Sequence, residues 1–420
     1  MLRRVSAQQA GELFGRSNRS AVDAQTLRDA GSIVEDVRTR GGAAVREHAE
    51  RLGDIEPGGP LLIGREAMDA SLSAMDAGEA DALRGAAGDI GRFALAQRAS
   101  VQDFDVPVEG GRLRQMVAPV GSAGCYAPGG RYPLPSSVLM TAVTARAAGV
   151  GGVVVASPRP APATLAAASI AGADALLAVG GAQGIAALAF GIDGLEPCDA
   201  ICGPGNRWVT AAKQLVSGTV RIDMLAGPSE VLVIADDSAD ADTVAADLLA
   251  QAEHDADARA NLVTTSPGFA DAVDERLRAR LETLPTAGVA GPAIERSVCV
   301  VAGDIEEAIR LSDLVAPEHL EIHTRDAPAV AARCRHYGAV FVGSGAAEVL
   351  GDYGIGPNHT LPTGGTARGF GGLSVFDFLR VRTGIELDRS QTPARVYERA
   401  ARLARMEGLE AHARSAEARL

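Results

Sequence analysis

Two residues that can ligate a metal stand three positions apart at the end of a predicted helix. The run Gln251-Ala252-Glu253-His254 closes a helical pattern that begins near Asp240. This spacing places the side-chain oxygen of Gln251 and the imidazole of His254 on one helix face, and both groups can bind metal ions. Solvated helix faces often carry such pairs, so the pattern needs further ligands before it indicates a metal site.

A third possible ligand lies in a turn-rich segment. Asp352 belongs to the run 351–359, whose glycines and proline let the backbone turn sharply and bring the carboxylate toward His359. A plain surface loop has the same composition. If Gln251, His254 and Asp352 converge with one more nitrogen, the donors are nitrogen and oxygen without thiolate. Such a set suits Zn²⁺, with Mn²⁺ or Co²⁺ as alternatives.

The best candidates for acid–base chemistry are neighbours in the run 317–323, at the mouth of a predicted strand. Histidine titrates near neutral pH, so His319 is suited to accept a hydroxyl proton. Glu318 is suited to activate water where apolar neighbours raise its pKa. In the competing structural interpretation, Glu318 pairs within a loop and His323 is only part of the strand.

Two glycine-rich turns follow apolar runs. In the first, 201–206, a strand leads into the helical pattern 209–213, so backbone amides at the helix start can face an anion such as a pyrophosphate. The run is not GxGxxG, and taken alone it is better explained by a plain strand-to-helix turn. The second, 124–131, indicates a rigid turn. Cys125 and Cys202 lie in these runs, and buried inert thiols are as good an interpretation as nucleophiles.

The elements that position these residues follow from the apolar pattern. Residues 20–100 show helical periodicity, and the tail from about 380 is Arg- and Ala-rich and predicted to be helical. Between them, short apolar runs alternate with amphipathic segments, which is typical of parallel α/β layers with ligands beyond the carboxyl ends of the strands. The predicted strands are 152–156, 175–179 and 200–202, then 231–235, 261–265, 298–301 and 339–342.

Composition limits the class of protein. A chain of 420 residues with 47% apolar and 22% charged residues holds two or more buried cores. The net charge of -13 opposes binding to nucleic acid or anionic lipid. Five scattered cysteines without a CxxC pair predict neither disulfides nor a thiolate zinc site. Because no apolar stretch is long enough for a membrane span or signal peptide, we expect a cytoplasmic protein without membrane contact.

Taken together, several segments resemble the histidinol dehydrogenase family in order and over nearly the whole chain. The matching segments are 124–131 with 135–140, 180–188, 203–206 continuing to Lys213, 223–231, 247–254, 316–320, and 356–368.

The resemblance implies a set of site residues and a homodimer. One zinc per subunit is implied, held by Gln251, His254 and Asp352 together with His412 supplied by the partner subunit. The implied acid–base pair is Glu318 and His319, and the implied NAD site contains Tyr126, Gln183 and Asn206. The residues implied to bind substrate are Ser229, Gln251, His254, His319, Asp352, His359, Glu407 and His412.

The implied reaction is the oxidation of L-histidinol to L-histidine with two NAD⁺, through an aldehyde that stays bound. Small departures from the family pattern lie at 132–134, at Trp208 and at 369–372. These departures leave open the alternative of a paralogue that uses zinc and NAD to oxidise another small polar alcohol, such as a sulfonated diol. A non-catalytic α/β protein is a third alternative, but it would require lost site residues, and none is lost.

The resemblance also implies an architecture. The expected fold class is α/β, with two incomplete Rossmann-like domains of parallel strands and small helical terminal segments that complete an intertwined homodimer. We expect an N-terminal helical segment over 1–20 and a discontinuous first α/β domain over 21–120 and 230–370. An inserted NAD-binding domain is expected over 121–229, and a helical tail that reaches the partner over 371–420.

Overall fold

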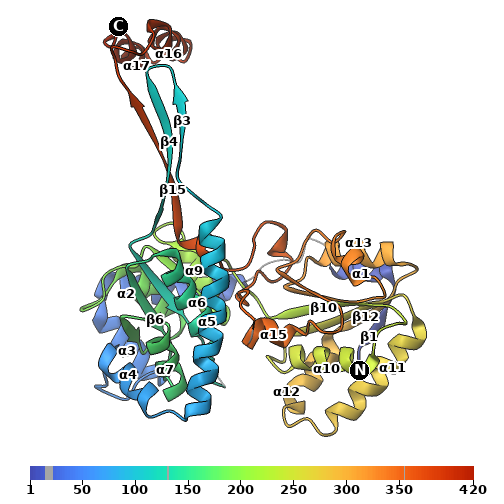
Figure 1. Cartoon of the computed structure of the whole chain (residues 1–420). Coiled ribbons are helices and arrows are strands. Elements are labelled where there is room, and N and C mark those ends of the chain that lie inside the picture. The colour runs from blue at the N-terminus through green and yellow to red at the C-terminus, as the bar shows by residue number, and fades with distance from the viewer. Residues whose placement is uncertain (15–21, 130–131, 354) are drawn as a thin grey trace. The chain divides into compact units, whose positions relative to one another are not determined.

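The computed structural model describes residues 1–14, 22–129, 132–353 and 355–420. Within them the chain divides into two units. Unit 1 comprises Met1–Leu95 and Val120–Phe378, and unit 2 comprises Ala96–Pro119 and Leu379–Leu420. The strands of unit 1 form two six-stranded sheets, here called Sheet I and Sheet II, and those of unit 2 form the three-stranded Sheet III (Figure 1).

Sheet I has the order β1-β12-β11-β10-β13-β14, and all its strand pairs are parallel. Its central strands are buried along their length, as expected of a parallel sheet covered on both faces. Its strands are β1 (Arg3–Val5), β10 (Glu230–Ala235), β11 (Arg259–Thr264), β12 (Val298–Val301), β13 (His319–His323) and β14 (Ala339–Val342).

Helices cover both faces of Sheet I (Figure 1). Alternate residues of β10 enter the two cores: Val231 and Val233 pack with one group of helices, and Leu232 and Ile234 with the other. The first group is α10 (Ala241–Ala252), α11 (Pro267–Leu281) and α12 (Ala287–Arg296). The second is α1 (Ala7–Leu13), α13 (Ile305–Val315) and α14 (Ala327–Ala331). A short helix, α15 (Glu348–Tyr353), follows β14.

Sheet II has the order β2-β7-β6-β5-β8-β9 and is parallel apart from the β2–β7 pair. One of its cores contains α2 (Ala24–Arg40), α3 (Gly42–Leu52), α8 (Gly181–Phe190) and α9 (Arg207–Val216). Its other helices are α4 (Arg65–Ser73), α5 (Ala77–Ala99), α6 (Pro135–Ala148) and α7 (Pro162–Ile170). Its strands are β2 (Leu62–Gly64), β5 (Ser122–Tyr126), β6 (Gly152–Ala156), β7 (Ala175–Leu177), β8 (Ala200–Cys202) and β9 (Arg221–Ile222).

The grouping of the N-terminal helices differs from the prediction. Residues 21–120 were expected to share a domain with 230–370, but β2 pairs with β7 and α2 and α3 pack in the core of Sheet II. Likewise, β1 adds a strand to Sheet I within the segment 1–20, of which 15–20 lie outside the described residues. Helical periodicity identifies an apolar face but does not say which sheet covers it.

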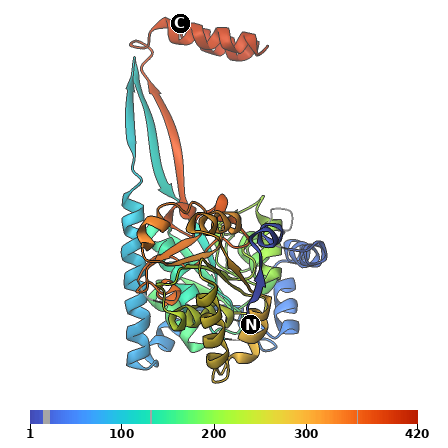
Figure 2. The same cartoon turned by 90° about the vertical axis from the view of Figure 1, so that its right-hand side faces the viewer.

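Unit 2 combines Sheet III with the end of the chain (Figure 2). Sheet III is antiparallel, in the order β15-β4-β3, and helices α16 (Ala394–Met406) and α17 (Glu410–Glu417) follow. Its strands are β3 (Phe104–Val108), β4 (Gly111–Pro119) and β15 (Leu379–Leu387). The prediction of a wholly helical tail was wrong for β15. In this strand apolar residues alternate with charged and polar ones, which is a strand pattern.

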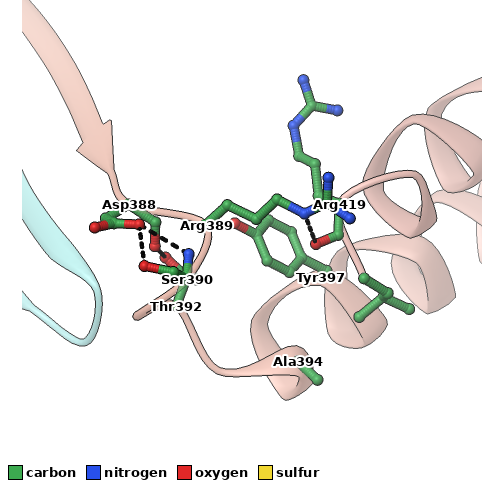
Figure 3. A pocket seen from close by; sticks show the side chains of 8 residues that line it. Asp388, Arg389, Ser390, Thr392, Ala394, Tyr397 and Arg419 are labelled. Atoms are coloured by element: carbon green, nitrogen blue, oxygen red, sulfur yellow. Dashed lines mark hydrogen bonds between the residues drawn. The ribbon is translucent and has the colours of Figure 1, made fainter.

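A surface hollow of about 510 Å³ lies in unit 2, between the end of β15 and the last helices (Figure 3). Asp388 Oδ1 accepts hydrogen bonds from the amide and hydroxyl of Ser390, and Arg389 Nε donates to the carbonyl of Arg419. None of the predicted site residues lines this hollow. In the described parts of the chain, no helix is both long and apolar enough to cross a membrane.

Candidate active site

The predicted acid–base pair lies at the amino edge of Sheet I, where two neighbouring strands begin. Glu318 directly precedes β13 and His319 starts it, while Ser229 directly precedes the adjacent β10. The expectation that ligands lie beyond the carboxyl ends of the strands points to the opposite edge of this sheet from the predicted acid–base pair. The strand pattern alone does not say which edge carries the chemistry. That depends on the side chains in the segments that enter the strands.

Glu318 is held by two hydrogen bonds and shielded from water. Its Oε2 accepts from the hydroxyl of Ser229 at 2.7 Å and from the amide of Glu230 at 2.9 Å. Burial raises the pKa of this carboxyl well above its usual range, although both hydrogen bonds act in the opposite direction. A carboxyl of raised pKa is a stronger base when ionised and retains a proton more readily when acid is needed.

His319 is buried beside Glu318. Its Nδ1 lies 3.2 Å from the carbonyl oxygen of Glu230 and 3.8 Å from Oε2 of Glu318. Burial lowers its pKa to about 3, so the ring is neutral near pH 7. A proton on Nδ1 would bond to the Glu230 carbonyl, and this tautomer leaves the Nε2 lone pair available to accept a proton.

A residue that sequence analysis missed completes this group. Glu348 begins α15, and its Oε1 lies 3.3 Å from Nδ1 of His319. The side chain is buried, which raises the pKa of its carboxyl. Its sequence signal was the i, i+4 spacing to Asp352, which places two carboxylates on one face of a helix. The contact with His319 joins residues 29 positions apart and is created only by folding.

The predicted metal ligands come from α10 and α15. Nε2 of His254, two residues beyond the end of α10, lies 3.7 Å from Oδ2 of Asp352. Ligand atoms of His254, Glu348 and Asp352 all lie within 4.8 Å of one another. Burial raises the pKa of Asp352, an effect that nearby His254 opposes. The structure thus brings an imidazole and carboxylates together at the distances of a ligand set.

Gln251 provides a test of whether these residues fit a metal. Its side chain is fully buried, and within the described residues neither its oxygen nor its nitrogen has a hydrogen-bond partner. An unpaired buried amide is costly unless another group satisfies it. With His254 and Asp352, it offers nitrogen and oxygen donors without thiolate, which is ligand chemistry that suits Zn²⁺.

The remaining predicted substrate residues fall in two places. His359 is half-buried, its Nε2 has no partner in the described part of the chain, and burial lowers its pKa to about 4. Glu407 and His412 belong to unit 2, where both are exposed, in the turn after α16 and on α17. Gly354, in the predicted loop 351–359, lies outside the described residues.

The predicted NAD residues lie at the carboxyl edge of Sheet II. Tyr126 ends β5, Gln183 lies in α8 after β7, and Asn206 caps α9 after β8. The chain runs from β5 outward to β7 and then returns to place β8 on the other side of β5. Tyr126 and Asn206 therefore flank a topological switch point, where open α/β sheets bind ligands.

Hydrogen bonds fix this edge. The Gly181 amide donates to Oη of Tyr126 at 3.2 Å, and Nε2 of Gln183 donates to buried Asp54 at 3.0 Å. Asn206 Oδ1 accepts from the amides of Trp208 and Val209, which caps α9.

The glycine at the turn after β8 is required by close packing. Gly203 has φ +115°, and a Cβ there would lie 2.0 Å from the carbonyl oxygen of Tyr126. Lys213 Nζ donates to the Gly203 carbonyl and pairs with buried Asp223. In the other predicted turn, 124–131, residues 130 and 131 lie outside the described residues.

Comparison with known proteins identifies the family. The family model described as histidinol dehydrogenase matches residues 16–420. The chain belongs to the histidinol dehydrogenase family. This confirms the family resemblance and, at the level of the family, the prediction of an oxidoreductase.

Relatives of the family match along most of their length. The chain is 46% identical to the histidinol dehydrogenase of Cereibacter sphaeroides over 394 residues, covering 92% of this chain and 90% of the relative. It is 44% identical to that of Rhodospirillum rubrum over 405 residues, covering 94% and 93%. The crystal structure of histidinol dehydrogenase from Elizabethkingia anophelis superposes with a TM-score of 0.91 at 31% identity, covering 100% and 98%. The predicted α/β fold class is confirmed.

The cysteines of this family member are buried and free. Cys125 and Cys202 lie on paired strands with their sulfur atoms 3.9 Å apart, and burial raises the pKa of Cys202 well above its usual range. A thiol of raised pKa is a poor nucleophile, which applies to Cys202. The burial of both side chains favours their interpretation as inert core thiols.

Proposed function

We propose that this chain is a zinc-dependent, NAD-linked dehydrogenase that oxidises L-histidinol to L-histidine through a bound aldehyde. The observation that carries the proposal is the buried pair Glu318 and His319. The pKa of the carboxyl is raised and that of the imidazole is lowered, beside a set of metal ligands. Family membership supports the substrate, since the relatives bear the name histidinol dehydrogenase.

In the first oxidation, His319 accepts the proton of the substrate hydroxyl at Nε2 while the carbinol carbon gives up a hydride. Its low pKa keeps the ring unprotonated at the start of the reaction. The contact of Nδ1 with the Glu230 carbonyl orients the ring and keeps the ring proton on Nδ1. Bound NAD⁺ supplies the hydride acceptor for both oxidations.

In the second oxidation, Glu318 takes a proton from water as the water oxygen adds to the aldehyde carbon. The proton that His319 gained in the first oxidation passes to the aldehyde oxygen, which completes the hydrate and leaves the His319 ring neutral again. The hydrate then gives up a second hydride, and His319 again removes a hydroxyl proton. Burial and the contact with Ser229 place Glu318 in a dry, fixed position for this task. One site thus removes two hydrides in sequence, and the aldehyde has no need to leave.

Zinc would be held by Gln251, His254 and Asp352 together with His412 of a second copy. Bound zinc would hold the imidazole and amino nitrogens of histidinol as a template. Ser229, His359 and Glu407 complete substrate binding. The buried, unpaired Nε2 of His359 offers an acceptor or donor for a polar substrate.

NAD binds at the carboxyl edge of Sheet II, along Tyr126, Gln183 and Asn206. The switch point between β5 and β8 supports this position. The start of α9 at this edge presents the positive end of a helix, which favours an anion such as a pyrophosphate.

The functional enzyme is a homodimer with one zinc per shared site. Unit 2 exposes large apolar side chains: Ile385 is 75% exposed and Met406 78%. Exposed apolar surface of this kind marks contacts with another chain, and His412 lies on the same unit. Size-exclusion chromatography with light scattering should give twice the chain mass, and an active monomer would contradict this. We place the enzyme in the cytoplasm.

The deciding experiment counts NADH. With zinc and excess NAD⁺, two NADH should form per L-histidinol consumed, with histidine as the product by mass. Glu318→Gln should stall after the first oxidation and give a ratio near one in a single-turnover measurement. No turnover by folded, zinc-loaded enzyme would overturn the proposal and direct the search to another small polar alcohol.

A further inference from the structure

A second group of buried titratable side chains lies next to the candidate site and has no role in the reaction proposed above. Nε2 of His323 is 3.5 Å from Oε2 of Glu321 and 3.8 Å from Oδ2 of Asp247. All three residues are buried, and in the described part of the chain none of these three atoms has a hydrogen-bond partner. We call this group the buried triad.

The triad shares its elements with the candidate site. Side chains at alternate positions of a strand point to one face, so Glu321 and His323 lie on the same face of β13 as His319. Leu320 and Ile322 face the opposite core. Asp247 lies on α10 one helical turn before Gln251.

Glu321 also reaches the second helix of the metal site. Its other oxygen, Oε1, accepts a hydrogen bond of 2.9 Å from the backbone amide of Glu348, the first residue of α15. A carboxylate at this position accepts a hydrogen bond from an otherwise unpaired amide of the first helical turn. Its negative charge also interacts favourably with the positive end of the helix dipole. The bond fixes the start of the helix that carries Glu348 and Asp352.

The triad therefore joins three elements that contribute to one site. Asp247 belongs to α10, which leads to Gln251 and His254, and Glu321 binds α15, which carries Asp352. Nε2 of His323 faces an oxygen of each carboxyl group, and α10 and α15 pack against each other. Metal ligation needs donor atoms in place within a few tenths of an ångström, and residues behind the ligands hold them there.

Burying three titratable groups is costly, and apolar residues of the same volume would often give equal or greater stability. The presence of these three buried groups despite this cost in folding free energy indicates a role other than stability. We propose that Asp247, His323 and Glu321 are positioning residues that fix α10 relative to α15 and so set the geometry of the metal ligands. This inference rests on the proposed function, because it concerns the metal site of that proposal.

The test uses the full chain and Co²⁺, whose visible absorption reports ligand geometry. Metal-free protein is titrated with Co²⁺, and its affinity and spectrum are recorded together with the thermal unfolding temperature. The variants are Asp247→Asn and Glu321→Gln. In a second measurement, metal analysis gives the number of Co²⁺ ions bound per chain at saturation.

Asp274→Asn is the matched control. Asp274 is a buried carboxylate on α11 that pairs with Arg4 at 3.0 Å and accepts from the amide of Leu2. It supports Sheet I but contacts neither α10 nor α15 through these bonds. The control therefore separates general loss of stability from loss of position.

We expect each triad variant to bind Co²⁺ about tenfold or more weakly and with an altered spectrum, while Asp274→Asn keeps both even if it unfolds earlier. Triad variants that unfold earlier yet keep the affinity and spectrum of the unmodified chain would overturn the inference and leave the proposed function standing. A second Co²⁺ per chain that Asp247→Asn removes would overturn it too, since the triad would then be a metal site. An unmodified chain that binds no Co²⁺ would overturn the proposed function and the inference together.

Discussion

Sheets I and II follow the same plan but carry their candidate sites at opposite edges. In each, the chain builds strands outward from a central strand and then returns to the other side: β10, β11 and β12 before β13, and β5, β6 and β7 before β8. Glu318 and His319 lie at the amino edge of Sheet I. Tyr126 and Asn206 lie at the carboxyl edge of Sheet II.

The difference follows from helix direction and side-chain chemistry. A helix that connects parallel strands begins at their carboxyl edge and ends at their amino edge. α9 thus presents a positive helix start at the carboxyl edge of Sheet II, where we propose that NAD binds. α10 presents a negative helix end beside Gln251 and His254. The first suits a pyrophosphate, and the second suits a cation. Topology offers both edges, and the residues placed there decide which one is used.

The largest effect is expected from removing the proposed base at the amino edge of Sheet I. His319→Asn should lower the rate of NADH formation from histidinol by about 100- to 10,000-fold, because no group accepts the hydroxyl proton. NAD⁺ affinity should be unchanged, since the proposed nucleotide site lies along Sheet II. Steady-state kinetics and direct NAD⁺ binding measure the two effects. His336→Asn, at a half-buried site after α14, is the control, and equal losses in both variants would remove His319 from catalysis.

The second-largest effect is expected from metal removal, which should affect the candidate site of Sheet I but not NAD⁺ binding at Sheet II. Dialysis against a strong chelator should abolish turnover, and Zn²⁺, Mn²⁺ or Co²⁺ should restore it, because Gln251, His254 and Asp352 offer only nitrogen and oxygen donors. NAD⁺ binding to the metal-free chain, followed by calorimetry, should persist. Turnover that survives complete metal removal, confirmed by elemental analysis, would contradict the assigned site.

Sequence reasoning located the buried strands well. The predicted runs 152–156 and 298–301 coincide with β6 and β12, because a strand covered on both faces is a continuous apolar run. β15 was not predicted because it is largely exposed. Its alternation of apolar and polar residues lies in an Arg-rich tail whose composition also fits a helix. The covering of Sheet II by α2 and α3 depends on tertiary packing, which periodicity does not contain.

Residues of the candidate site could be predicted where they are close together in the sequence. They could not be predicted where only folding brings them into contact. Gln251 and His254 were suggested by one helical pattern, and the structure brings His254 to within 3.7 Å of Asp352. Glu348 was missed because its contact with His319 joins two elements far apart in the sequence. The amino edge of Sheet I was missed because the general rule for open sheets favours the other edge.

A smaller effect concerns the pH dependence of stability at Sheet I. Burial, with a further contribution from Glu321, raises the pKa of Asp247 from 3.8 to about 7. The folded state therefore holds this proton more tightly than the unfolded state. The stability gained is fully present below about pH 4 and is lost as the pH rises through 7. Asparagine has no such proton to lose.

Asp247→Asn should therefore gain stability relative to the unmodified chain as the pH rises from 4 to 7. Unfolding temperatures measured for both proteins across this range give the difference, and the comparison cancels the titration of other groups. A difference that stays constant with pH would mean that Asp247 is ionised in the folded state throughout the range.

The smallest effect is expected from removing one helix N-cap beside each sheet. Asn206 caps α9 beside Sheet II, and Asp304 caps α13 beside Sheet I by accepting from the amide of Glu307. Replacing either cap by alanine should cost about 1 kcal/mol of folding stability. Only Asn206→Ala should also raise KM for NAD⁺ several-fold, with kcat little changed, because only this helix start faces the proposed nucleotide. Thermal unfolding and kinetics at saturating histidinol measure both. If KM for NAD⁺ rose equally in Asp304→Ala, the effect would follow from lost stability, and the carboxyl edge of Sheet II would lose its assigned role.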